Sequence, residues 1–108
     1  RYQIAVLKDR ASRGGSRYVH ESLRVGQTIS LGAPRNLFEL DESAPYTVLV
    51  AGGIGITPIY AMLQRLAVLE RPGQLIYCAR SRADAAYLQE IEALIAASPK
   101  LKVQYHWD

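Results

Sequence analysis

The stretch VAGGIGITPI, residues 50–59, joins an apolar run to a helical pattern. The run TVLVA, Thr47 to Ala51, is typical of a central parallel strand that is covered on both faces. Gly52, Gly53 and Gly55 follow where the chain must bend into a helix. Because glycine has no Cβ atom, the backbone amides at these positions can approach a ligand closely. The stretch therefore predicts a ligand-binding turn at the carboxyl end of a strand.

The residues after the glycines predict the start of a helix. Thr57 suits the N-cap, and Pro58 suits the first helical position, where its missing N–H costs nothing. Free amides and the positive end of the helix dipole then favour an anion, and a dinucleotide pyrophosphate is the obvious one. The spacing departs from GxGxxG and lacks the GK[ST] of a nucleotide-hydrolysing P-loop. A tight turn without a ligand stays open as the alternative at this point.

Downstream periodicity predicts the rest of an α/β unit. Apolar residues recur at helical spacing over 59–66, and Gln74 to Ala79 reads as a second buried strand. Asp84 is the expected cap of a second helix with an apolar face over 87–95. Leu101 to Trp107 alternates strictly, as an edge strand with one wetter face does. The order β-α-β-α-β predicts half of a doubly wound parallel sheet.

The first part of the chain has a different pattern. Residues 2–7, 24–31 and 36–40 are expected to form short strands, which resemble a piece of a β-barrel or sandwich. A polar stretch from Asp41 to Pro45 lacks periodicity, so we place a domain boundary there. The predicted domains are residues 1–44 and 45–108.

A second glycine site lies in the first domain. The sequence SRGGS, Ser12 to Ser16, places Arg13, Gly14 and Gly15 before a short helix that Ser16 is expected to cap. This arrangement can hold a phosphate, although a solvent-exposed loop is the simpler interpretation. Two phosphate-type loops on either side of a domain boundary favour two phosphorylated cofactors.

Composition limits the classes of function. The 108 residues carry a formal charge of +3 with no basic run, so nucleic-acid binding has no support. The apolar runs are too short for a membrane span. The single cysteine, Cys78, lies in an apolar run, and a cytoplasmic location is the default expectation. Neither histidine has a second ligand at metal-binding spacing, so no metal site is expected.

Several motifs in order point to a known family. The segments RGGS, APRNLFEL, VAGGIGITPI, YCARSR and AAYL together resemble the phthalate dioxygenase reductase family, in particular the reductase components of vanillate demethylase, within the ferredoxin–NADP reductase superfamily. The resemblance implies a flavin-binding β-barrel, an α/β nicotinamide-nucleotide domain and a ferredoxin domain. It further implies hydride transfer from NADH to FMN, then electron transfer through an iron–sulfur cluster to an oxygenase.

The resemblance also implies roles for individual residues. Gly14, Gly15 and Ser16, beside Arg13, would hold the FMN phosphate, and the backbone of Ala5, Val6 and Leu7 would contact the isoalloxazine ring. Thr57 would lie near the flavin, Gly53, Ile54 and Gly55 would line the pyridine-nucleotide crevice, and Arg80 would lie near the adenosine end. No catalytic side chain is expected, because the cofactors carry the chemistry.

The resemblance covers the middle of a longer protein. The family's RxYS flavin motif should precede Arg1 and its cysteine-glycine-proline motif should follow Asp108. With one cysteine the chain cannot ligate a 2Fe–2S cluster, which we expect only in the parent protein. We therefore expect a piece that carries half of each cofactor domain and is inactive when isolated. The alternatives are a non-catalytic nucleotide-binding module and a structural remnant that associates with copies of itself.

The choice between NADH and NADPH is open in the sequence. Family precedent favours NADH. Arg80 and Arg82, however, could equally receive a 2′-phosphate, and no carboxylate directly follows the second strand.

Overall fold

The computed structural model describes residues 1–108, which form two units. The N-terminal unit comprises Arg1–Leu37 and the C-terminal unit comprises Phe38–Asp108. Each unit makes most of its residue contacts within itself. The predicted domain boundary between residues 44 and 45 stays a prediction.

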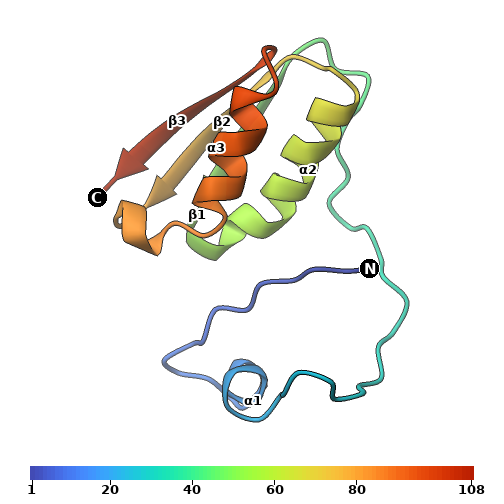
Figure 1. Ribbon diagram of the computed structural model, residues 1–108, viewed down its shortest axis with the longest axis vertical. Helices are drawn as coiled ribbons and strands as arrows, with labels where there is room; N and C mark the ends of the chain where they lie inside the picture. Colours follow the sequence, from blue (N-terminus) through green and yellow to red (C-terminus); the bar gives the residue numbers. More distant parts are fainter. The chain divides into compact units, whose positions relative to one another are not determined.

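The C-terminal unit is a parallel sheet of three strands with two helices (Figure 1). The strands are β1 (Thr47–Gly52), β2 (Gly73–Ala79) and β3 (Leu101–Trp107), in the order β1-β2-β3. The crossovers contain α2 (Ile56–Val68) and α3 (Leu88–Ala96). The predicted α/β class and the β-α-β-α-β order are confirmed.

The core lies between the sheet and the helices. Every second residue of β2, from Gly73 to Ala79, is buried, and Leu49 of β1 pairs with Leu75 of β2 in register. The buried side chains share one face of the sheet or the inner face of a helix: Leu49, Ala51, Leu75, Tyr77, Ala79, Leu101, Ile56, Ile59, Met62, Leu63, Leu66 and Ile91. Removing these apolar groups from water is the main stabilising contribution to the unit.

The other face of the sheet differs from the expectation for β1. We predicted a strand covered on both faces, but Val48 is 54% exposed and Val50 is 62% exposed. Crossovers between parallel strands are right-handed as a rule, and with the order β1-β2-β3 this places both helices on the same side. One face of β1 therefore stays open.

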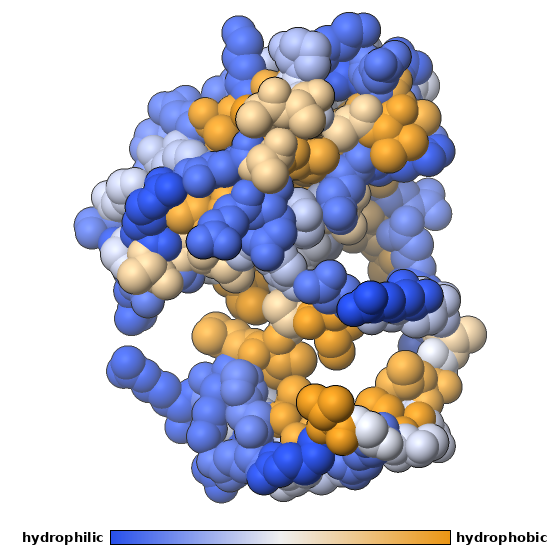
Figure 2. All heavy atoms as spheres, viewed as in Figure 1, coloured by the Kyte–Doolittle hydropathy of each residue, from blue (hydrophilic) through white to orange (hydrophobic).

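The N-terminal unit contains α1 (Gly15–Glu21), and the rest of it consists of turns and chain without regular secondary structure. The strands predicted over 2–7, 24–31 and 36–40 are not formed, since no strand precedes Thr47. A strand is defined by the ladder that it makes with a partner, and these segments have none. Figure 2 shows apolar side chains at the surface of this unit, where Tyr2, Ile4 and Leu37 are exposed.

None of the helices is long and apolar enough to cross a lipid bilayer. No three histidine, cysteine or acidic side chains are grouped so that they could hold a metal ion.

Tyr77 of the core and the partly buried Tyr105, which packs against the core, are expected to respond differently to loss of the hydroxyl group. Tyr77 Oη donates to the Ala86 carbonyl at 3.0 Å, whereas the buried Tyr105 hydroxyl has no partner. Tyr77→Phe should lower the free energy of unfolding by about 1 kcal/mol, because it leaves a carbonyl without its donor. Tyr105→Phe is the matched control and should leave that free energy unchanged or raise it. Urea denaturation measures both, and equal losses would contradict this account.

An ion pair joins α2 to the segment before β1, and its effect on pKa can be tested. Arg65 Nε lies 2.5 Å from Glu42 Oε1, and this hydrogen bond lowers the pKa of Glu42. The charged form of Glu42 is favoured in the folded state. The contribution of this ion pair to the free energy of unfolding is therefore present above pH 4.5 and is lost as the pH falls through the lowered pKa. Arg65→Gln should return the pKa of Glu42 towards 4.5, as measured by NMR titration.

Arg71→Gln is the control, because Arg71 acts on the pKa of Glu42 only through its charge and more weakly. An unchanged Glu42 pKa in Arg65→Gln would show that the pair does not form in solution.

Candidate nucleotide-binding site

The glycine loop lies at the carboxyl end of β1. The strand ends at Gly52, a 3-10 turn, η1, covers Gly53–Gly55, and α2 begins at Ile56. Gly53 has φ of 53°, a conformation that side chains with a Cβ atom rarely adopt. Gly52 and Gly55 have φ of −129° and −60°, which any residue adopts.

Open space surrounds all three glycines. A Cβ atom built at Gly52, Gly53 or Gly55 would meet no atom within 4 Å. The local fold therefore requires glycine at Gly53 only. The other two leave the backbone bare beside the end of the strand, where ligands of open parallel sheets bind.

The start of α2 differs from the prediction. Gly55 is the N-cap, and no side chain caps the helix, so the N-cap role assigned to Thr57 is wrong. The preceding 3-10 turn brings the helix start to Ile56, and Thr57 Oγ1 instead donates to the Ile54 carbonyl at 3.2 Å. The Ile56 amide donates to the Gly53 and Ile54 carbonyls, and Pro58 is the third residue of the helix, so its predicted place at the first position is also wrong. The positive end of the helix dipole still lies at this loop. The loop brings Gly53, Ile54, Gly55 and Thr57 together as expected.

The second predicted part of the site follows β2. Arg80 is exposed directly after the strand, and a second 3-10 turn, η2, covers Arg82–Asp84. Ser81 Oγ accepts from the Asp84 amide at 3.3 Å and donates to Asp84 Oδ2 at 2.7 Å. Asp84 therefore belongs to this turn, and its predicted role as cap of α3 is wrong.

A hollow of about 600 Å³ opens beside this turn. The residues that line it come from the turn and from the start of α3: Arg82, Ala83, Ala85, Leu88, Gln89 and Glu90. Arg82 Nη2 lies 2.6 Å from Glu92 Oε1, which fixes its guanidinium against α3.

Aromatic contacts that the sequence did not reveal hold the loop 80–87. Tyr87, the N-cap of α3, has φ of 60° and stacks on Tyr60 of α2 with ring centroids 4.9 Å apart. The Tyr77 hydroxyl anchors the same loop through Ala86. Burial raises the pKa of both Tyr60 and Tyr77, so both stay neutral hydrogen-bonding groups at physiological pH.

The phosphate-type loop of the N-terminal unit is organised by Ser12. Its Oγ accepts from the Gly14 amide at 3.1 Å and from the Arg17 amide at 3.3 Å. The hydroxyl groups of Ser12 and Ser16 are hydrogen-bonded at 3.1 Å, and Ser16 Oγ accepts from the Asp9 amide. Ser12 thus satisfies an amide of α1, and the N-cap role predicted for Ser16 is wrong.

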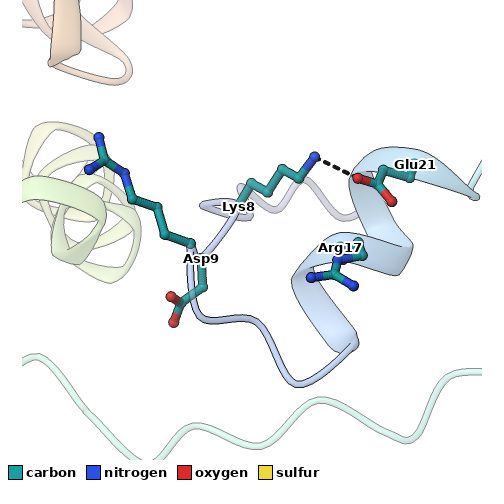
Figure 3. Close-up of a pocket in the computed structure, with 5 residues that line it drawn as sticks. Lys8, Asp9, Arg17 and Glu21 are labelled. Carbon is teal, nitrogen blue, oxygen red and sulfur yellow. Dashed lines mark hydrogen bonds and ion pairs between the residues drawn. The ribbon is translucent and has the colours of Figure 1, made fainter.

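The N-terminal unit also contains a hollow that is lined by charged side chains. A hollow of about 410 Å³ is lined by Lys8, Asp9, Arg10, Arg17 and Glu21, with Lys8 Nζ 2.7 Å from Glu21 Oε1 (Figure 3).

The segment that was expected to contact a flavin ring is half-buried at Ala5 and Val6 and exposed at Leu7. The Val6 carbonyl accepts from His20 Nε2 at 2.6 Å, so it is already engaged with α1.

Residues 49–108, more than half of the chain, match the family model described as the oxidoreductase NAD-binding domain. This chain belongs to that family. It is 50% identical over 107 residues to the vanillate O-demethylase oxidoreductase of Pseudomonas sp. strain HR199, covering 99% of this chain and 33% of that protein. The resemblance to phthalate dioxygenase reductases is thereby confirmed. The chain spans about a third of the length of the curated relatives it matches.

Solved structures agree with this assignment. An intact type IV self-sufficient cytochrome P450 monooxygenase matches with a TM-score of 0.85 and 41% identity, over 94% of this chain and 13% of that one. The flavohaem-like FAD/NAD-binding domain of nitric oxide dioxygenase from Vibrio cholerae matches with a TM-score of 0.80 and 25% identity, over 94% of this chain and 45% of that one. The comparisons support binding of NAD(H) and of a flavin by the family. The contacts predicted for single residues stay predictions.

Ser12→Ala should loosen the loop before α1. Two amides lose their acceptor, and a helix of one or two turns is marginal without such support. We expect hydrogen exchange at Gly14 and Arg17 to accelerate about fivefold, as expected for about 1 kcal/mol per hydrogen bond. Ser30→Ala, in a segment without regular secondary structure outside the loop, is the control. Unchanged exchange at both amides in Ser12→Ala would contradict the organising role of Ser12.

Proposed function

We propose that this chain is the central part of an NAD(P)H-dependent flavin oxidoreductase that passes electrons from NADH through FMN to the oxygenase component of a ring-hydroxylating or demethylating system. The observation that carries the proposal is the loop Gly52–Gly55. Its backbone is bare at two positions where the fold does not require glycine. This space fits a ligand that contacts main-chain amides, as a dinucleotide pyrophosphate does.

The residues of the C-terminal unit would bind and orient the dinucleotide. The amides of Gly53, Ile54 and Gly55 would hold the pyrophosphate at the start of α2. The hydrogen bond from Thr57 to the Ile54 carbonyl fixes the loop in the bent form that presents these amides. Arg80, exposed after β2, would contact the adenosine end. When bound, the nicotinamide and the flavin supply the hydride and single-electron chemistry.

The residues of the N-terminal unit would hold FMN. Gly14, with φ of 125°, and Gly15 leave open space at the start of α1, so that a phosphate can approach the backbone between Arg13 and Ser16. The Ser12 hydroxyl keeps this loop in shape. We place the isoalloxazine against the backbone of Ala5, Val6 and Leu7. The Val6 carbonyl already accepts from His20, so it is not available as an acceptor for the flavin.

The names of the relatives support the partner. They include an oxidoreductase of vanillate O-demethylation and a reductase subunit of a tert-butanol monooxygenase system. Because the chain has one cysteine, any 2Fe–2S cluster must be ligated outside it. That single cysteine is also consistent with the cytoplasmic location that we propose.

Self-association of this chain is a second candidate, because apolar residues are open on both units. Val48 and Val50 lie on the uncovered sheet face, and Tyr2 and Ile4 are exposed in the N-terminal unit. A structural remnant of this kind would elute as a multimer and bind neither NADH nor FMN.

Gly55→Ala tests the proposal in the full-length protein. Its φ of −60° suits alanine, and the added Cβ meets no protein atom, so folding stability should stay within about 0.5 kcal/mol. NADH affinity should fall about tenfold or more, because the methyl group occupies the space of the pyrophosphate. Calorimetric titration with NADH measures this change.

Gly32→Ala is the control, because its Cβ also meets no atom and it lies far along the chain from the loop. Unchanged NADH affinity in Gly55→Ala would remove the observation on which the proposed function rests.

A further inference from the structure

The ion pair between Arg82 and Glu92 lies where the ribose of a bound dinucleotide is expected. Arg82 follows the carboxyl end of β2, the strand whose end meets the adenosine ribose in sheets of this type. Glu92 lies on α3, ten residues later, and its Oε1 lies 2.6 Å from Arg82 Nη2. Both side chains are about half exposed, so a ligand can reach them.

Carboxylates outnumber free cations around the hollow beside this turn. Arg82 is the one basic residue in its lining, and Glu90 lies in the same lining. Asp84 is held by Ser81 within the same turn. Because Glu92 already neutralises Arg82, the lining of the hollow offers no unpaired cation to a dianionic group.

A ribose 2′-phosphate and a ribose 2′-hydroxyl make different demands on such a site. Guanidinium groups bind phosphate well when two N–H groups of the planar fork are available together. In Arg82 one arm of the fork is held by Glu92. A 2′-hydroxyl carries no charge and can instead donate to a carboxylate.

We propose that Glu92 is a specificity-determining residue, which biases the protein towards NADH by holding Arg82 away from a 2′-phosphate. This inference rests on the proposed function, because it assumes that a nicotinamide dinucleotide binds along the edge of this sheet. It assigns coenzyme choice, which the sequence left open, to a contact between η2 and α3.

The effect should be moderate. An exposed ion pair contributes little free energy, so removing Glu92 should change discrimination about threefold to fivefold. The ion pair changes the preference between NADH and NADPH. It does not change the affinity for the part of the molecule that the two coenzymes share.

Glu92→Gln in the full-length protein tests the inference. Calorimetric titration with ADP-ribose and with 2′-phospho-ADP-ribose gives a readout that does not depend on flavin or turnover. We expect the affinity for 2′-phospho-ADP-ribose to rise about threefold to fivefold, while the affinity for ADP-ribose stays within about twofold. The ratio of kcat/KM for NADPH to that for NADH should rise by the same factor.

Two further variants separate the causes. Glu42→Gln breaks another exposed ion pair of the same unit, with Arg65, and should change neither affinity. The double variant Arg82→Gln/Glu92→Gln should lose the gain, because the freed guanidinium is absent.

Three outcomes overturn the inference. The first is an unchanged preference in Glu92→Gln, and the second is a gain that persists in the double variant, which would assign the 2′-phosphate to Arg80. The third is a wild-type protein that binds neither nucleotide, which would also contradict the proposed function. In the first two outcomes wild-type protein still binds ADP-ribose, so the proposed function survives.

Discussion

The parallel pairing of β1 with β2 is the constraint on which the C-terminal unit depends. The pairing begins where Thr47 lies opposite Gly73, and a Cβ atom at Gly73 would lie 2.8 Å from the Thr47 carbonyl oxygen. Strands this close and parallel must be joined by a crossover, so α2 has to pass over one face of the sheet. The bend that starts this crossover is the Gly52–Gly55 loop. The geometry that builds the core therefore also sets bare amides at the edge of the sheet.

The sequence predicted the C-terminal unit well because its signals are local. The spacing of Ile59, Met62 and Leu66 gave one face of α2, and strict alternation gave β3. The strands expected before Thr47 failed for a different reason. Apolar, β-branched composition favours extended chain, but a strand also needs a partner that composition does not supply.

The exact first residues of the helices and the contacts between distant residues could not be predicted from the sequence. Thr57, Ser16 and Asp84 are all good capping residues, yet short turns and competing hydroxyl groups placed the starts elsewhere. The residues expected at the nucleotide loop were nevertheless brought together. The Arg82–Glu92 pair and the Tyr60–Tyr87 stack could not be predicted, because both depend on how α3 packs against the sheet and α2.

Tyr87 combines a left-handed backbone with a ring contact to α2. A residue with a Cβ atom pays about 1–2 kcal/mol to adopt this conformation, which glycine would adopt freely. The stacked pair of Tyr60 and Tyr87 stabilises the folded state by a comparable free energy, about 0.5–1.5 kcal/mol. The joint before α3 is thus close to energetic balance, and its shape depends on a ring that belongs to α2. A displacement of α2 at Tyr60 would therefore change the backbone at the start of α3 through one pair of tyrosine rings.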